Sequence, residues 1–321
     1  MEQGVAVPAA ASPTSLAGLL ARGERATFHG PPANAVSSLE RAVELARGDG
    51  REAEATAATW LLGVAHAALG RFGTALRVLD PVVAPLYDAV SGEQTGPELL
   101  LFGSLAAATI ASVHRQLGGH ATAREFDALG LTASGAIANL DEAVFDCRLG
   151  LACDAIGLGE VDAVQPDLAA AAELVDRHPD WWRQRVRLDW ARAEYALLRD
   201  DVTQAIDAAS EAVDRAELAR APRHVAKGLL FLGVAQAQVS PEEAIATLRR
   251  AAMLAEQLGT LPLIWLPRAL LGALLADTDP AESAAHLQAA RSAVLAIAGD
   301  LPDGVRERWL ARPDVEALLT A

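Results

Sequence analysis

The chain has 321 residues, of which 52% are hydrophobic and only 4% aromatic, so its core must be built from Ala, Leu and Val. Side chains of this size let helices pack closely. The formal net charge of −15 and the pI near 4.9 argue against sequence-independent binding to nucleic acid or to an anionic membrane, because both surfaces repel an acidic protein. The same charge favours a basic peptide as a partner.

Neither a signal peptide nor a membrane span is expected. Residues 1–13 lack a basic start and a continuous apolar core, which predicts a disordered leader followed by a single domain over residues 14–321. The most apolar window, residues 261–276, is too short to span a bilayer and is interrupted by two prolines and an arginine. Cys147 and Cys153 lie six apart on one predicted helix, hence on different faces, which disfavours a disulfide and favours a reduced, cytoplasmic setting.

Apolar residues at helical spacing, separated by Gly, Pro and polar breaks, predict consecutive helices from residue 14 onward. Pro81 and Pro85 should kink or shorten the fourth of them. The break SGEQTGP at residues 91–97 is either a surface connection or a functional loop. The expected helices span about 14–27, 33–47, 51–69, 71–87, 98–117 and 120–140, followed by a pair over 141–178, a fifth pair that begins with a helix over 181–199, two pairs over 223–299 and a short terminal helix over 302–321.

An internal repeat supports this division. Residues 62–75 (LGVAHAALGRFGTA) and 110–123 (IASVHRQLGGHATA) match at His, Leu, Gly, Thr and Ala positions that are each 48 residues apart. In both copies a small residue precedes a turn glycine and a second small residue follows it, which lets two helix backbones approach closely across the turn. This template pairs Gly23 with Ala35, Gly63 with Ala75, Ala111 with Ala123, Ala193 with Ala205 and Gly272 with Ala284, whereas Gly233 with Ala244 fits one residue short and Gly150 only loosely.

Two capping signals near the C-terminus support a period of 39 residues. The segments 240–243 (SPEE) and 279–282 (DPAE) each read as an N-cap, a proline at the first helical position and a glutamate at the third. Capping chemistry and apolar spacing therefore agree on one repeat length.

The residues that carry the repeat resemble tetratricopeptide repeats. Leu62, Gly63, Gly70 and Ala75 stand where that family places Leu-Gly, a turn and Ala. The units are longer than the usual 34 residues, and they are similar to the helical-repeat arm of large bacterial LuxR-type and ATP-dependent transcriptional regulators. The resemblance implies an all-α, right-handed superhelical solenoid of about seven antiparallel helix pairs with a C-terminal capping helix. The ATPase and DNA-binding modules of those regulators have no counterpart here.

The resemblance also implies a concave groove lined by the first helix of each pair. Its lining is mostly apolar, which suits an amphipathic helix or a lipophilic small molecule more than a nucleotide. Trp60 and Trp190 are the expected anchors, because an indole supplies a large contact area and one donor; the alternative is that both belong to the core between repeats. The residues expected to bind a partner are Trp60, Val64, Arg115, Leu151, Trp190, Glu194, Leu230 and Val234.

The densest basic and aromatic cluster lies at residues 181–187, where two tryptophans precede three arginines at alternate positions. Trp181, Trp182 and Arg185 are therefore a candidate protein interface or homodimer contact. In the alternative interpretation, one tryptophan packs at the start of the helix and the arginines stay in water.

No motif for catalysis or for a cofactor is recognised. The sequence has no phosphate-binding G-x-x-x-x-G-K-S/T loop, no G-x-S-x-G elbow and no Cys–His constellation. His66 and His114 are expected to be packed histidines bonded to carbonyl oxygens, and Glu282 with His286 a solvated pair, so neither a metal nor a cofactor is expected.

The leading functional hypothesis is a non-catalytic adaptor that binds a peptide, or a helix of another protein, in its concave groove. The alternative is a regulatory module, associated with transcriptional regulation, that senses a small apolar effector in the same groove. A third and weaker option is an enzyme in which the groove has become a pocket.

Overall fold

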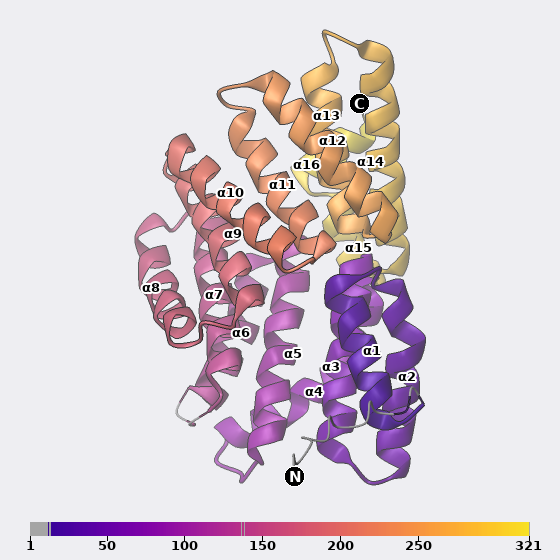
Figure 1. Cartoon of the computed structure of the whole chain (residues 1–321), viewed down its shortest axis with the longest axis vertical. Helices are drawn as coiled ribbons and strands as arrows, with labels where there is room; N and C mark the ends of the chain where they lie inside the picture. The colour runs from indigo at the N-terminus through magenta and orange to yellow at the C-terminus, as the bar shows by residue number, and fades with distance from the viewer. Residues whose placement is uncertain (1–11, 13, 136, 138, 321) are drawn as a thin grey trace, which may run out of the picture.

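In the computed structural model of the chain, residues 12, 14–135, 137 and 139–320 are described, and they form sixteen helices and no strand (Figure 1). The helices pack in chain order as seven pairs followed by two short helices, which confirms the expected all-α solenoid of seven helix pairs. The leader expected over residues 1–13 lies, apart from Ser12, outside the described residues.

The seven pairs are α1 Leu16–His29 with α2 Ala33–Gly48, α3 Glu52–Leu69 with α4 Phe72–Val90, α5 Pro97–Gln116 with α6 His120–Ser134, α7 Asp141–Gly157 with α8 Val161–Arg177, α9 Trp182–Leu198 with α10 Val202–Leu218, α11 Pro222–Gln236 with α12 Pro241–Leu258 and α13 Leu261–Leu275 with α14 Pro280–Asp300; α15 Asp303–Leu310 and α16 Pro313–Thr320 follow.

The helix ends follow the expected capping chemistry in part. Gly70, the turn glycine of the repeat, ends α3 with a φ of 80°, a left-handed conformation that L side chains rarely adopt. At the start of α14 the Asp279 carboxylate accepts a hydrogen bond from the backbone N–H of Glu282 at 3.0 Å. The side chain of Ser240 makes no such bond at the start of α12.

Of the two expected effects of its prolines, a kink or a shortening of the fourth helix, the shortening is wrong. α4 continues through Pro81 and Pro85 to Val90. Pro81 and Arg77 are exposed, so the Arg77 carbonyl that Pro81 leaves without a helical donor faces water. The opposite side of α4 is buried, Leu86 completely, and this packing holds the helix together.

Two other predicted helices end early. α6 stops at Ser134, followed by Gly135, rather than continuing to residue 140. The terminal segment forms two helices instead of one, with a break at residues 311–312. Pro313 disfavours the helical conformation for the residue before it, and it then begins α16.

Within several pairs the close approach joins a glycine to a leucine. A Cβ added at Gly63 would lie 2.3 Å from Cδ2 of Leu79 on the neighbouring helix, and Gly23, Gly233 and Gly272 face leucines in the same way. A helical side chain leans toward the N-terminus of its helix, so a leucine beyond the expected alanine covers the glycine. In the last pair the expected alanine, Ala284, is exposed, and Ser283 instead donates a hydrogen bond to the Gly272 carbonyl at 2.7 Å.

The solenoid curves until its last repeats touch its first ones, and Figure 1 shows α12–α14 above α1–α3. α13 contacts α3, and α14 contacts α4. Thr74 donates its backbone N–H and its hydroxyl to the Asp300 carboxylate, at 2.9 and 2.7 Å. One buried apolar cluster also joins Phe72 to Ile297 and Trp309. We call these contacts of α3–α5 with α13–α16 the closing seam.

The first helices form the inner layer of the curve. Each packs on the first helix of the next pair, from α1 on α3 through to α11 on α13. Among the described second helices of consecutive pairs, only α4 and α6 make a comparable contact. Because elements on the inside of a curved stack lie closer together, this pattern assigns the first helices to the concave side.

α5 is the one described helix that is long and apolar enough to cross a bilayer by length and composition. However, 56% of its most apolar 18-residue window is buried inside the molecule. A core helix passes the same test, and α5 packs against α3 and α7 in the inner layer as well as against α4 and α6.

Candidate binding site on the inner helices

Trp60 lies on the inner layer in the contact between α3 and α5. Its Nε1 donates a hydrogen bond to Thr109 Oγ1 of α5 at 3.2 Å, and its ring centroid lies 6.0 Å from that of Phe102. Only 8% of Trp60 is exposed. Most of its surface therefore contributes to the packing between repeats.

Trp190, on α9, has a different environment. Its ring stacks on His224 of α11 at 5.4 Å between centroids, and the Lys227 ammonium lies 4.7 Å from its centroid, close enough for a cation–π contact. The Trp190 Nε1 has no hydrogen-bond partner. This buried donor lies beside the partly exposed side chain of Lys227.

Arg115 is held in a buried ionic network. Its Nη1 donates to Asp127 Oδ2 of α6 at 2.5 Å and to Asp154 Oδ2 of α7 at 3.1 Å. Burial opposes the charge of Arg115, but the two carboxylates outweigh it and raise its pKa. Burial also raises the pKa of Asp127 to about 8, against the lowering effect of Arg115. Burial and the neighbouring Asp154 carboxylate favour the protonated form of Asp127, whereas Arg115 favours its ionised form.

The remaining groove residues lie on the same layer. Val64 packs against the cluster between α3 and α5, and Leu230 and Val234 belong to the cluster shared by α11, α12 and α13. Leu230 is buried, whereas Leu151 and Glu194 are partly exposed. Of the expected groove residues, Leu151 of α7 and Glu194 of α9 are therefore more accessible than Trp60 of α3 and Leu230 of α11.

Side chains from four first helices meet at one place on this layer. Burial raises the pKa of Glu194, while Lys227, Arg115 and His120 lower it. Burial likewise raises the pKa of the Cys153 thiol to about 12, with Glu194 adding to the effect and Lys227 opposing it. These electrostatic interactions place groups from α5, α7, α9 and α11 together. We call Cys153, Trp190, Glu194, Arg223 and Lys227 the inner junction.

The candidate interface at the start of α9 divides into separate contacts. Trp181 stacks on His178, with centroids 4.0 Å apart, whereas Trp182 lies 5.2 Å from His29 of α1. Arg185 donates to the Val175 carbonyl at the end of α8. Trp182 therefore lies where the first pair meets α9 and α11, on the opposite side of the helix start from Trp181.

Arg223 and Lys227 were not among the residues singled out from the sequence. They lie in the first two turns of α11, before the positions that the repeat pattern assigns to the groove. A signal was present: the cations at 223 and 227, like those at 183 and 187, are four residues apart and share one helix face. Two such like-charged pairs in an acidic chain indicate a cationic surface.

A cleft of about 540 Å³ lies outside the inner layer, between α8 and α10 with α9 as its floor. Its lining includes Tyr195 together with Arg192, Arg199, Asp207 and Glu211, so it carries charges of both signs. None of the inner-junction residues lines it.

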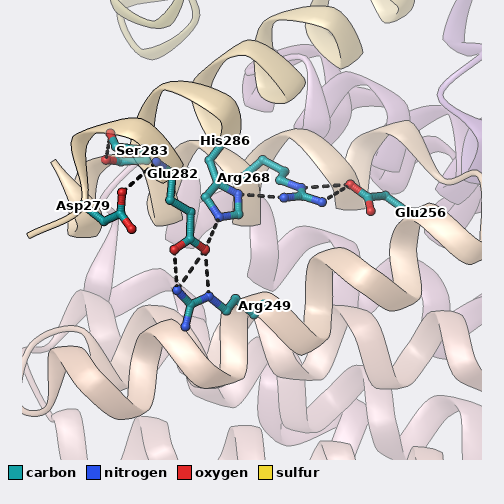
Figure 2. A network of polar contacts seen from close by, with 8 residues as sticks. Arg249, Glu256, Arg268, Asp279, Glu282, Ser283 and His286 are labelled. Carbon is teal, nitrogen blue, oxygen red and sulfur yellow. Dashed lines mark hydrogen bonds and ion pairs between the residues drawn. The ribbon is translucent and has the colours of Figure 1, made fainter.

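The polar network around His286 serves packing among α12, α13 and α14, and Figure 2 shows its side chains directed at one another. Arg268 donates to His286 Nδ1 at 2.8 Å, and the opposite nitrogen, Nε2, donates to Glu282 at 3.3 Å. Glu282 also accepts hydrogen bonds from Arg249 of α12. Burial lowers the pKa of His286, which is 4% exposed, so the histidine of the expected solvated pair is enclosed, whereas Glu282 remains partly exposed.

The two repeat histidines are packed in different ways. His66 is buried as expected, but its Nδ1 has no hydrogen-bond partner, so the expected carbonyl bond is not made by that atom. His114 stacks parallel on Phe126, with centroids 5.8 Å apart. Within the described ranges, no three His, Cys, Asp or Glu side chains gather into a group that could hold a metal ion.

No protein-family model and no curated protein matches the sequence, but solved structures share its fold. A Rap protein complexed with Competence and Sporulation Factor has a TM-score of 0.60 at 11% identity, covering 95% of this chain and 79% of its own. Aspartyl phosphate phosphatase F from Bacillus subtilis has a TM-score of 0.50 at 13% identity, covering 98% and 84%.

A third structure is a signal transduction ATPase with numerous domains that carries a tetratricopeptide repeat sensor, from Pyrococcus horikoshii. Its TM-score is 0.50 at 14% identity, and the match covers 82% of this chain and 40% of that one. At such identities the likeness concerns the fold, and that fold is a helical-repeat solenoid.

Proposed function

We propose that this chain, a tetratricopeptide-repeat-like helical repeat protein, is a non-catalytic adaptor whose inner layer binds a peptide or a helix of another protein. The observation that carries the proposal is the inner junction. There the Trp190 indole N–H, the Glu194 carboxylate and the Lys227 ammonium are all without a direct polar partner among the described residues. Such groups, next to aromatic rings on a concave surface, are the kind that recognise a polypeptide.

The fold supports the same proposal. A solenoid offers an extended inner surface to which a chain segment can bind along several repeats. The similar Rap protein is known in complex with Competence and Sporulation Factor. By analogy of fold alone, we infer a bound factor for this chain as well.

Charge shapes the expected partner at two scales. The net charge of −15 favours a partner that is basic overall. At the inner junction, however, Arg223 and Lys227 favour an acidic group. A peptide of mixed charge satisfies both conditions.

The test is affinity selection of peptides from a random displayed library on the full-length chain, followed by anisotropy titration of the selected sequences. Leu151, partly exposed on the inner layer, is replaced by Asp, and the matched control replaces Leu218, an outer leucine that is 88% exposed. We expect L151D to weaken binding at least tenfold, roughly 1.4 kcal/mol, and L218D to leave it within twofold.

Two outcomes would overturn the adaptor. One is the selection of no peptide, or of peptides whose binding ignores L151D. The other is a small apolar molecule that copurifies with the wild type, persists in native mass spectrometry and is lost from L151D. That second result would favour the sensing module in its place.

A further inference from the structure

Four cations gather where α9 and α11 begin. They are Arg183 and Arg187 of α9 and Arg223 and Lys227 of α11, and we call them the cationic cluster. Burial is the largest cause that lowers the pKa of Arg223 and of Lys227. Arg183 and Arg187 lower that of Arg223 further, and Arg187 and Arg223 do the same for Lys227, against the raising effect of Glu194. The four charges therefore lie close enough to repel one another.

Aromatic rings enclose the cluster on several sides. The Arg183 guanidinium lies 5.0 Å from the ring centroid of Phe28 on α1, and the Lys227 ammonium lies 5.6 Å from that of Phe231. His224 lies between Trp182 and Trp190, with centroids 5.1 and 5.4 Å away. Burial holds the pKa of His224 well below its usual value, so the imidazole is neutral and adds no charge.

Two of the four cations form direct ion pairs within the protein. Arg183 pairs with Glu142 and Arg187 pairs with Asp146, both on α7. Those two contacts tie α7 to α9 and account for both carboxylates. Gln184 also donates to Glu142, at 3.1 Å, which further commits that carboxylate.

Arg223 has no such partner. Among the described residues, no carboxylate lies within 4.0 Å of its guanidinium, and its buried Nε makes no hydrogen bond. Its pKa is lowered to about 10, first by burial and then by Arg183 and Arg187, yet it remains protonated at neutral pH. Arg223 is partly exposed as a residue, but a guanidinium with a buried, unpaired Nε and no counterion costs stability, and a binding site is one reason for a protein to keep it.

We propose that Arg223, flanked by Arg187 and Lys227, binds a carboxylate of the partner, supplied either by a peptide C-terminus or by an acidic side chain. A guanidinium offers two parallel N–H donors that match the two oxygens of a carboxylate. The aromatic rings then contact the apolar part of the same residue. This inference rests on the proposed binding of a polypeptide, although the site can be tested with a small carboxylate.

The probe is N-acetyl-leucine as its sodium salt, with N-acetyl-leucinamide as the uncharged control, at constant ionic strength. Binding is followed by tryptophan emission, since Trp182 and Trp190 adjoin the cluster, and by the melting temperature. The variants are R223Q, R223K and the control R25Q, an exposed arginine of α1. We expect the carboxylate to bind saturably to the wild type and to R25Q, at least tenfold more weakly to R223Q, and the amide not to bind.

A second readout separates a binding role from a structural one. Without the probe, R223Q should melt no lower than the wild type, because the substitution removes a cation that has no counterion and whose buried Nε makes no hydrogen bond. R223K keeps the charge but loses the paired donors, so it should bind with intermediate affinity. A large loss of stability in R223Q, with normal probe binding in R223K, would assign Arg223 to folding and overturn the proposal.

Further results test the carboxylate site itself, identify the source of the carboxylate and separate this site from the proposed adaptor function. Failure of the probe to saturate on the wild type overturns the carboxylate site, as does tighter, Arg223-dependent binding of inorganic phosphate. Selected peptides that bind only with a free C-terminus identify the terminal carboxylate, and those indifferent to amidation identify a side chain. If the probe binds and no peptide does, the site stands and the adaptor fails; if peptides bind equally to R223Q, only this site fails.

Discussion

Replacing Gly73 by Ala tests the closing seam directly. Gly73 lies in the first turn of α4, and a Cβ there would lie 2.0 Å from the Asp300 carbonyl oxygen at the end of α14. The obstacle is backbone, so the added methyl group must push α14 away or strain both helices. Thr74, the next residue, would then lose its two hydrogen bonds to the Asp300 carboxylate.

The magnitude follows from these contacts. Overpacking against backbone costs about 1–3 kcal/mol, and each hydrogen bond to a carboxylate contributes about 1.5 kcal/mol at the low end of its range. We discount the latter because Thr74 is only partly buried, and expect G73A to lose about 3 kcal/mol of unfolding free energy. Helix propensity alone predicts the opposite sign, a gain of up to about 1 kcal/mol.

The assay is urea denaturation, together with hydrogen exchange at the Thr74 amide. The matched control is G48A, at the end of α2, where an added Cβ meets nothing within 4 Å. D300A removes the hydrogen bonds without a clash and should cost less than G73A. A G73A protein as stable as the wild type, with unchanged protection at Thr74, would show that the solenoid does not close there.

Three other predictions concern the core and its titrating groups. G233L should lose more than about 1 kcal/mol by overpacking, since its Cβ alone would lie 2.6 Å from a leucine side chain, while G299L, which faces open space, should change little; equal melting temperatures would contradict the helix register. Because the pKa of Asp127 is raised from 3.8 to about 8, its contribution to stability is present below pH 4 and is lost as the pH rises through 8. The wild type should therefore lose stability between about pH 4 and pH 8 more steeply than D127N in urea titrations, and parallel curves would refute this. Cys153, partly exposed but with its pKa raised to about 12, and the buried Cys147 should resist a disulfide reagent at pH 8 until urea unfolds the chain, whereas labelling of both thiols in the folded chain within seconds would contradict the raised pKa and the burial of Cys147.

Local features of the fold were readable from the sequence because they depend on short-range chemistry. The turn glycine Gly70 and the Asp279 cap mark helix ends through backbone conformation and one side-chain oxygen, both encoded within a few residues. The recurrence of small residues located the close helix contacts. The pattern of small residues did not predict which side chain packs against each glycine. That residue, for example Leu79 against Gly63, depends on how far the two helices are shifted along each other.

The candidate site was predictable only in outline. Trp190 was selected from its place in the repeat, and it does lie on the inner layer beside Lys227. The accompanying Arg223 was missed, because the repeat pattern assigns no groove position to the first turn of α11. Its lack of a counterion is a property of three-dimensional neighbours and cannot be read from spacing.

The sequence by itself determined the class of fold, the number of helix pairs and most of their boundaries, because periodicity, turns and caps act over one or two helical turns. Only the tertiary structure decided that the solenoid closes, bringing Thr74 to Asp300 across 226 residues and Phe28 of α1 over Arg183 of α9. Each repeat adds a small rotation set by side-chain packing, and seven of them sum to the curvature. A small change in the rotation of each repeat would keep the first and last repeats apart. No local pattern of residues therefore specifies the contact between them.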